Sequence, residues 1–445
     1  MGLISQVIKM VSYSLIVFVN TLRSYWPLII WPEILRTNFG VTSITEQTLL
    51  VSYYYISYNM GNIVSSFLWP YIAKKWSVKT CITIALFGNI LTAALFAYMP
   101  NMYAIIGMRA VAGFFKNSNS VGKSFVYEFC EDRYRQYGFS FLNLFSFLAV
   151  FVGPMFGFSI YNWTGKNYWK CWLIVCFLYT IMGIFYYIVF YLTYIQVENA
   201  STLQRSIVDE EEKKGLISKH RKKKEMMGFF EAFFFIIKAK SIRGYVLVFV
   251  LAKSVNKALT VISVFYLEAN WNEEGMGISS KTLSYLNLLV SVPVMLLTIT
   301  IPSLVPKYFG YKTFLTFILL LYTFNIMMMP ALKQIIGMLG YNSYYWLILI
   351  NQGMVYCTRP KIFTPFINYL INKGTSKRGR VAVNSVNSIL LTSFICILMN
   401  IISPLYSYCV HGDLFKAIHP FNLYLPFGFL ASLILLAIVG INTSG

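Results

Sequence analysis

Residues 47–99 read QTLLVSYYYISYNMGNIVSSFLWPYIA, then KKWSVK, then TCITIALFGNILTAALFAYM. The first and third segments are apolar and long enough to cross the roughly 30 Å hydrocarbon core of a bilayer. The six residues between them include three lysines. Short basic loops are typical of the cytosolic side of a membrane. This order of span, basic loop and span indicates a multi-pass membrane protein.

The whole composition agrees with that class. The chain has 445 residues, of which 57% are hydrophobic and only 12% are charged, whereas a soluble domain carries about 25% charged residues. The apolar residues are grouped in runs of span length, so we predict an all-α membrane protein with twelve transmembrane helices. The predicted spans are 10–32, 47–73, 80–99, 102–128, 138–161, 169–193, 243–267, 281–305, 313–332, 343–371, 381–405 and 421–441.

The basic residues outside the spans lie mostly in the loops of one side, including the run His220-Arg221-Lys222-Lys223-Lys224. The positive-inside rule therefore predicts that both termini are cytosolic. The membrane topology accounts for where the basic residues behind the net charge of +21 are placed, so we predict no nucleic-acid partner. The sequence does not distinguish the plasma membrane from an endomembrane or the vacuole.

The spans divide into two groups of six. We predict an N-terminal half over 1–194, a charged cytosolic linker over 195–241 and a C-terminal half over 242–445. The loop after the second span, Lys74…Lys79-Thr80, has the same pattern as the loop after the eighth span, Lys307…Lys312-Thr313. Such pseudo-symmetry is typical of transporters whose binding site lies between the repeats, near the middle of the bilayer.

Basic side chains also occur inside the first, fourth, seventh and tenth spans. Each would cost roughly 2.5–3.5 kcal/mol at the centre of a membrane helix, so we expect them to face a shared polar interior. With the neighbouring Asn256, they form the predicted substrate site: Arg23, Arg109, Lys116, Lys123, Lys253, Asn256, Lys257, Arg359 and Lys361.

Acidic residues are missing from the middle of every predicted span, Glu33 and Glu268 fall at outer span ends, and all three histidines lie in loops. A buried site with bases and no acids favours a bound anion, which Arg grips through its fork and Lys attracts as a point charge. This pattern favours exchange or uniport over proton-driven transport. For Lys123 and Lys361 snorkelling to the membrane surface is an equal alternative.

Several motifs resemble the major facilitator superfamily. They are the loop Trp69–Lys79, the series Arg109…Gly113, Lys123…Glu128, Gly138 and Gly153-Pro154-x-x-Gly157, and Arg378-Gly379 with Asn384. They are most similar to the branch of zinc-induced-facilitator-like carriers and tetracycline-type antiporters. The resemblance implies two pseudo-symmetric six-helix halves, a cavity lined by helices 1, 4, 7 and 10, and gating residues at Gly61, Lys74, Lys75, Lys79, Glu128, Gly153, Pro154, Gly157, Arg378 and Gly379. For Arg109, which matches a family Arg, it also implies a role in the scaffold or coupling machinery as the alternative to substrate contact.

The loop departs from the family pattern in a way that bears on gating. Lys74 stands where the family has an Asp, Ser77 replaces its Gly and Val78 replaces an Arg. The cytosolic gate should therefore be latched differently. In the fifth span, Gly153, Pro154 and Gly157 have two open interpretations, a packing kink or a hinge, because Pro removes a helix bond and Gly removes side-chain bulk.

The sequence thus predicts a secondary active or facilitative transporter of a small organic or phosphate-bearing anion, working by alternating access. The alternatives are a proton-coupled exporter of drugs or metal chelates, and a non-transporting membrane scaffold or receptor. No nucleophile–base pair, metal cluster or phosphate-binding loop is present in the sequence. We therefore expect no enzymatic activity, cofactor or bound metal, and a monomer whose partners are its substrate and the lipid bilayer.

Overall fold

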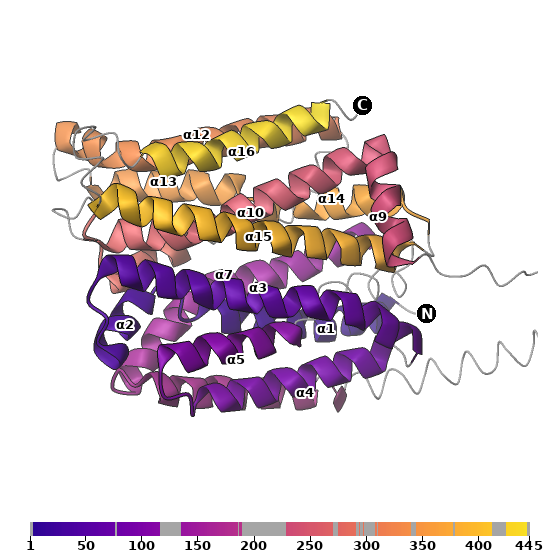
Figure 1. The fold of residues 1–445 in the computed structure, drawn as a ribbon, viewed down its shortest axis with the longest axis horizontal. Coiled ribbons are helices and arrows are strands. Elements are labelled where there is room, and N and C mark those ends of the chain that lie inside the picture. The colour runs from indigo at the N-terminus through magenta and orange to yellow at the C-terminus, as the bar shows by residue number, and fades with distance from the viewer. Residues whose placement is uncertain are drawn as a thin grey trace, which may run out of the picture.

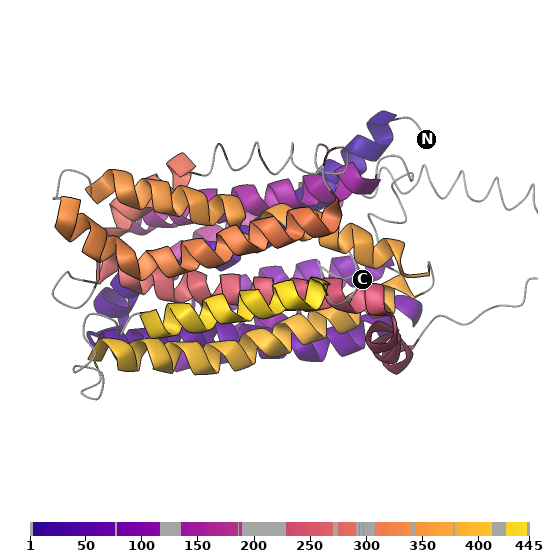
Figure 2. The ribbon, with the colours of Figure 1, turned by 90° about the horizontal axis from the view of Figure 1, so that it is seen from above.

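The structure, a computed structural model, describes residues 3–75, 78–115, 135–185, 187–188, 228–269, 275–290, 293, 297, 308, 310–339, 344–376, 379–411 and 424–442. Over these ranges every regular element is a helix. The long helices run side by side along one axis in two perpendicular views (Figures 1 and 2). Both chain ends lie at the same end of the molecule, which we call the terminal end; the opposite one is the distal end.

The helices before the linker lie together in the lower part of Figure 1. They are α1 (Leu3–Tyr25), α2 (Trp31–Phe39), α3 (Ile44–Lys75), α4 (Val78–Phe96), α5 (Met102–Phe114), α7 (Arg135–Trp163) and a helix over Tyr168–Phe185.

The remaining helices lie together in the upper part of the same view. They are α9 (Phe229–Lys238), α10 (Lys240–Glu268), a helical stretch over 280–290, α12 (Tyr311–Leu339), α13 (Tyr344–Thr358), α14 (Pro360–Lys373), α15 (Arg380–His411) and α16 (Tyr424–Asn442). The all-helical, multi-pass fold class is therefore confirmed.

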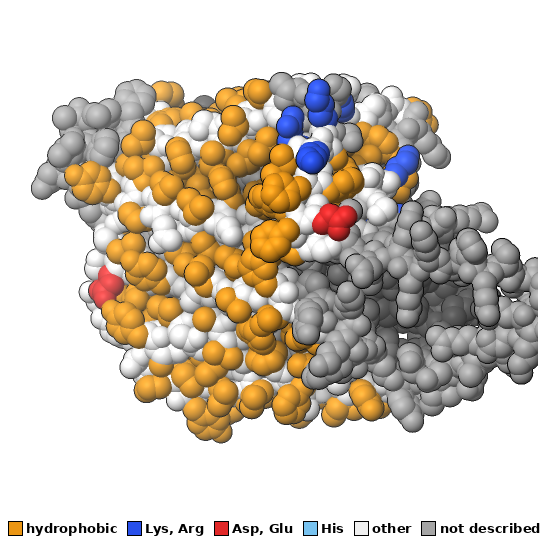
Figure 3. Space-filling view, turned by 45° about the vertical axis from the view of Figure 1, so that its right-hand side comes forward, with side chains coloured by type: hydrophobic (Ala, Val, Ile, Leu, Met, Phe, Trp, Pro, Cys, Tyr) orange, Lys and Arg blue, Asp and Glu red, His pale blue; other side chains and the backbone are white. Residues whose placement is uncertain are grey.

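Helices suited to crossing a membrane account for much of this architecture. Within the described residues, six helical segments are long and apolar enough to span a bilayer, and two shorter apolar helices cover Cys81–Phe96 and Met102–Phe114. One face of the molecule is covered widely by hydrophobic side chains, with Lys and Arg gathered towards the terminal end (Figure 3). Large apolar side chains such as Phe87 and Phe177 are exposed, as expected where lipid is the solvent.

Two predicted spans are interrupted by proline. The first was expected to run over 10–32, but α1 ends at Tyr25, a turn follows, and α2 begins at Trp31. The tenth was expected to be continuous over 343–371, but it is broken between α13 and α14 at Arg359, whose ψ is 148°. A residue before proline avoids the helical region because of a clash with the proline ring, and Pro27 and Pro360 act at these two places.

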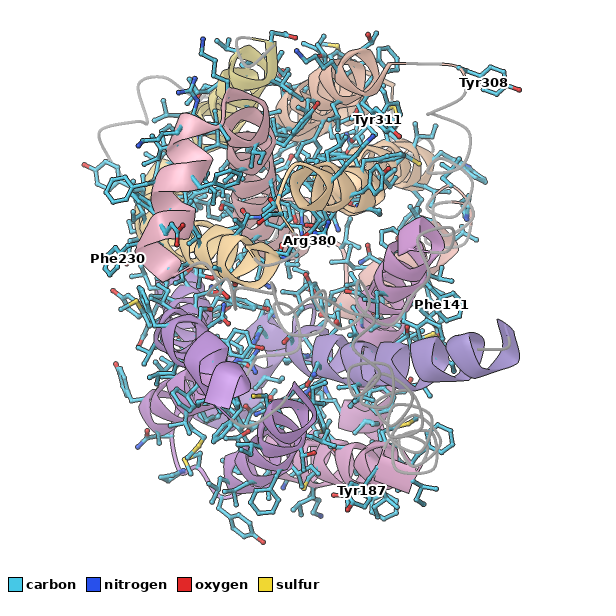
Figure 4. The ribbon with its side chains drawn as sticks, turned by 90° about the vertical axis from the view of Figure 1, so that its right-hand side faces the viewer. Phe141, Tyr187, Phe230, Tyr308, Tyr311 and Arg380 are labelled. Carbon is cyan, nitrogen blue, oxygen red and sulfur yellow. The ribbon has the colours of Figure 1, made fainter. Side chains whose placement is uncertain are left out.

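A helix also occupies the end of the segment predicted to be a charged linker. α9 buries Ala232 and Ile236 and exposes Phe230 and Phe234 on its other side. It lies at the terminal end, packed against α15 and α10. In the view from that end, Phe230 points outwards, away from the rest of the bundle (Figure 4).

Close helix pairs build the first half. A Cβ atom at Gly61 of α3 would lie 1.9 Å from the carbonyl oxygen of Ala110 in α5, and one at Gly113 would lie 2.0 Å from that of Tyr58. The two helices therefore touch backbone to backbone, as small residues permit in membrane proteins. This contact fixes the position of Arg109, one turn from Gly113 on α5.

The two groups of helices meet chiefly along α3 and α15. The hydroxyl groups of Ser52 and Ser403 are hydrogen-bonded, and Asn62 Nδ2 donates to Thr392 Oγ1 at 3.0 Å. α10 also contacts α3, and α14 contacts α7. The space enclosed between these pairs contains the candidate site.

Candidate functional site

A central cavity of about 220 Å³ lies between the two groups of helices. α1, α3, α5 and α7 line one side, and α10, α14 and α15 line the other. Most of its polar lining comes from Asn20, Thr21, Ser24, Tyr25, Tyr55, Tyr58, Asn59, Arg109, Ser146, Lys253, Asn256, Lys257 and Thr364. No Asp, Glu or His is among the described residues that line it.

Arg109 is the buried cation of the first half. Its guanidinium carbon lies 4.1 Å from the ring centre of Tyr58 and 4.5 Å from that of Tyr54. Nη2 donates to Ser24 Oγ at 3.3 Å, while Nε and Nη1 are buried without a hydrogen-bond partner in the described part of the chain. Buried donors are normally satisfied, so this guanidinium holds two unused donors beside the cavity.

Lys253 and Lys257 supply the cations of the second half. They are four residues apart on α10 and therefore share one face of the helix, as predicted. Lys257 Nζ reaches across to the first half, 4.0 Å from the ring centre of Tyr55 and 4.9 Å from that of Tyr25. Lys253 Nζ lies 4.4 Å from the ring centre of Phe249. Both lysines line the same cavity as Arg109 and Asn256.

Arg359 borders a second, smaller void of about 20 Å³ on the distal side of the cavity. Its neighbours there include Tyr25, Asn287 and Gln352. The break before Pro360 places Arg359 at the junction of α13 and α14 rather than on a continuous helix face. It therefore lies next to the central cavity without lining it.

Arg23 was predicted to contact substrate, but the structure places it elsewhere. Nη1 donates to the backbone and side-chain oxygens of Asn89 at 3.2 and 3.1 Å, and Nη2 donates to Thr92 Oγ1 at 2.9 Å. The rings of Phe96, Trp172 and Tyr179 surround it at 5.5–5.7 Å. The cavity face of α1 carries residues 17, 20, 21, 24 and 25, and Arg23 points away from that face.

Part of the predicted set lies outside the described residues. Lys116, Lys123, Glu128 and Arg378 belong to segments that the structure does not describe, and for Lys74, Lys75, Lys79 and Lys361 it describes the helix but not the side chain. Of the other gating candidates, Gly379 lies in the turn before α15, where its N–H donates to Ser376 O at 2.9 Å.

The predicted gating residues of α7 pack against the end of α1. A Cβ at Gly157 would lie 2.0 Å from the carbonyl oxygen of Trp26, and one at Gly153 would lie 3.2 Å from Tyr25 Cβ. Pro154 lies inside α7 and borders the small void. The two glycines therefore allow close packing of α7 against the end of α1. This contact supports the packing interpretation for the glycines, and the hinge interpretation stays a prediction for Pro154.

The sequence interpretation missed the aromatic and amide lining. The rings of Tyr25 and Tyr55 contact Lys257 and the ring of Tyr58 contacts Arg109, all by cation–π interactions. Asn20 and Asn59 add amide groups to the lining. A usable signal was present, because Tyr55, Tyr58 and Asn59 are three and four residues apart on one helix face in the middle of an apolar span. Within the described residues, no group of three or more His, Cys, Asp or Glu could hold a metal ion.

Comparison with known proteins agrees with this architecture. A sequence model described as Major Facilitator Superfamily matches residues 13–400. The chain belongs to the major facilitator superfamily and is a membrane transporter of that class. No curated protein sequence matches it.

Solved structures share the fold at low sequence identity. The human organic anion transporter MFSD10 (TETRAN) superimposes with a TM-score of 0.70 and 12% identity, covering 98% of this chain and 99% of that one. The nucleoside transporter NupG superimposes with a TM-score of 0.63 and 12% identity, with the same coverage of both chains. At such identity the likeness concerns the fold alone.

Proposed function

We propose that this protein carries a small organic or phosphate-bearing anion across its membrane by alternating access. The observation that carries the proposal is the guanidinium of Arg109, with two buried and unused donors beside a cavity. A buried donor without a partner is unfavourable, and the oxygen atoms of a carboxylate or phosphate would accept charge-assisted hydrogen bonds from these donors. Lys253 and Lys257 lie across the same cavity, and none of its described lining residues is acidic.

The cavity is closed on its distal side. Leu28 and Ile29 of the first half meet Val264, Leu267 and Leu283 of the second around a void of only about 20 Å³. These contacts would have to part for a substrate to reach the cavity from the distal end. Rocking of the two halves, 1–194 and 242–445, would provide that opening, with the terminal end facing the cytosol and the linker 195–241 joining the halves there.

Lys257 gives a physical reason for exchange rather than free reorientation. In the structure its ammonium group rests on Tyr55 and Tyr25 of the opposite half, an attraction worth about 2 kcal/mol when desolvated. An anion held by Arg109 would compete with these rings for Lys257. In a loaded carrier, the bound anion neutralises Lys257 while the two halves move. In an empty carrier, Lys257 must leave the rings of Tyr55 and Tyr25 without an anion to replace that attraction.

Two weaker supports point the same way. The human protein that shares this fold is an organic anion transporter, and the motifs quoted above resemble the zinc-induced-facilitator-like and tetracycline-type branch. We extend the proposed substrate contacts to Asn256, Arg359, Lys116, Lys123 and Lys361, and the gating role to the residues named with the family resemblance. A monomer is sufficient, because the cavity is formed within one chain.

Counterflow in proteoliposomes tests this proposal. Vesicles preloaded with an unlabelled panel of carboxylates and phosphate esters are offered the labelled compounds without a pH gradient. We expect uptake of at least one anion to be stimulated by internal anion, and Lys257→Ala or Arg109→Gln to reduce it at least tenfold. Arg359→Ala should also reduce uptake, because Arg359 borders the adjacent void.

Lys238→Ala is the matched control, since this lysine lies on α9 at the terminal end, away from the cavity. Uptake that requires a pH gradient and survives the cavity substitutions would contradict the anion proposal and favour a proton-coupled exporter. Absence of flux for the whole panel, from a protein that remains folded, would favour a scaffold or receptor.

A further inference from the structure

A polar stripe runs along α10 from the central cavity to the distal end. Lys253 and Lys257 border the cavity, Thr260 and Ser263 border the small void, and Glu268 borders a third pocket. Their spacing of three to five residues keeps them on one side of the helix. The three spaces therefore follow one another along the surface by which α10 faces the first half.

The third pocket, of about 100 Å³, lies where the two halves meet at the distal end. It is lined by Pro32 and Arg36 of α2, by Thr42 just before α3, by Ile44 and Gln47 in the first turns of α3, and by Phe265, Glu268 and Ala269. Residues of both halves therefore surround Glu268, and parting of the halves would expose its carboxyl group to water.

Glu268 lies in this pocket without a charged partner for its carboxyl group within the described residues. Both oxygens are buried and form no hydrogen bond within the described residues. No ion pair joins it to Arg36 within the described residues; Arg36 Nε donates to Pro32 O at 3.1 Å, and the neighbouring acid Glu33 forms an ion pair with Lys166 at 2.8 Å. The sequence predicts Glu268 at an outer helix end, where water would satisfy it, and its burial differs from that expectation.

A carboxylate in such a place is unfavourable, because water is removed and no positive charge or full set of donors replaces it. Binding a proton removes the charge and leaves a single hydroxyl to be satisfied. The groups that influence this carboxyl group from neighbouring elements are Ser280, Arg36 and Glu33. The Ser280 hydroxyl group supplies a single neutral donor, Glu33 is already paired, and Arg36 is exposed to solvent, so these groups replace only part of the lost water.

We propose that Glu268 is a proton-binding site of the distal gate, and that its protonated form stabilises the closed arrangement of that end. The proposal rests on the proposed alternating access. When the halves part, water reaches the carboxyl group and the ionised form becomes favourable. A proton bound from the distal solution therefore favours closure, and a rise in pH there favours opening.

The direction of the effect follows from linkage: the state that binds the proton more tightly gains population as the pH falls. Because the proton enters and leaves on the same side, the site regulates the gate without requiring net proton transport. This separates the proposal from a proton-coupled exporter, in which the proton would cross the membrane with each cycle.

Labelling of a buried cysteine tests the gate without any substrate. In a chain whose seven native cysteines are replaced, Ile29→Cys reports opening, because Ile29 is buried in the distal closure. Glu46→Cys, exposed at the same end, corrects for ionisation of the thiol. We expect the rate ratio of Ile29→Cys to Glu46→Cys, measured with a maleimide, to rise at least fivefold as the pH is raised from about 5 to about 8.

Adding Glu268→Gln should make this ratio low and independent of pH, because glutamine mimics the neutral carboxyl group. Adding Glu33→Gln, a neighbouring acid that already has a partner, should leave the pH dependence in place. A flat ratio in the parent chain, or a pH dependence that survives Glu268→Gln, would overturn the proposal. Leu283→Cys is the second reporter if Ile29→Cys does not fold, since Leu283 lines the same void.

The two proposals fail in different ways. Labelling needs no transported compound, so a pH-dependent ratio together with no anion flux would leave the gate standing and remove the substrate assignment. Anion exchange together with a pH-independent labelling ratio would support the substrate assignment and contradict the gate proposal.

Discussion

At the scale of single residues, two buried arginines show opposite designs. Arg23 donates to Asn89 and Thr92 and lies among three aromatic rings, so its hydrogen bonds hold α1 against α4. Arg109 is buried more completely and leaves both Nε and Nη1 unused, whereas only Nε of Arg23 lacks a partner within the described residues. A satisfied buried network stabilises a fold, while an unsatisfied buried donor costs stability. The first is built for structure and the second for a ligand.

This contrast predicts that the two residues respond differently to the same change. Arg23→Gln should destabilise the protein by on the order of 3 kcal/mol, because hydrogen bonds to a buried charge are lost and Thr92 loses its donor. Arg109→Gln should change stability by less while reducing anion exchange at least tenfold. Thermal unfolding of the purified variants in detergent, followed beside counterflow, measures both. Equal losses of stability at the two positions would contradict the distinction.

At the scale of elements, helix pairs in the first half are set by direct backbone contact. α3 and α5 touch at Gly61 and Gly113, and α7 touches the end of α1 at Gly157. A side chain at these points has nowhere to go, because the neighbouring atoms belong to backbone rather than to a flexible side chain. The positions of Arg109 and Tyr25 beside the cavity depend on these contacts.

Substitution of glycine by alanine should therefore give opposite results at two places. Gly157→Ala should lower the unfolding temperature, since overpacking costs typically about 1–3 kcal/mol. Gly107→Ala should raise the unfolding temperature slightly, because nothing lies within 4 Å of its Cβ position. The higher helix propensity of alanine stabilises the folded state by about 1 kcal/mol. The unfolding temperatures of the two variants are measured in the same detergent, and each variant serves as the control for the other. A rise for Gly157→Ala would contradict the close contact.

How far the elements could be predicted depended on proline. Apolar run length gave the number of spans and their order, because span length is fixed by the bilayer. It could not show the breaks at Pro27 and Pro360, since proline is tolerated within membrane helices when neighbours satisfy the freed backbone groups. It also missed α9, whose mixed apolar and basic residues adjoin a charged segment and suggested a linker.

At the scale of the whole molecule, the sequence placed Arg109, Lys253, Asn256 and Lys257 in one cavity, and the structure brings these four together. The burial of Glu268 could not be foreseen, because it depends on α2 and α3 of the other half closing over the end of α10. Contacts between halves far apart in sequence carry no local pattern. The same limit applied to the tyrosines that hold Lys257.

The contact between Ser52 and Ser403 predicts a way to lock the transporter. Both hydroxyl groups lie at the interface of α3 and α15 and are hydrogen-bonded, so cysteines at these places should form a disulfide. In a chain without other cysteines, we expect oxidised Ser52→Cys/Ser403→Cys to lose exchange because the distal ends of the halves cannot part, and a reducing agent to restore it. The two single variants should be indifferent to oxidant. Full exchange by the cross-linked protein would show that α3 and α15 stay together throughout the cycle.

The backbone contacts at Gly61, Gly113 and Gly157 also bear on how the gene can vary. Every amino-acid replacement of glycine adds at least one carbon atom, so no missense change at these three codons is free of collision. Gly107, one turn before Ala110 on the same helix, has open space around it. Natural variants should therefore accumulate at codon 107 and be removed at 61, 113 and 157, although all four encode the smallest residue in an apolar helix.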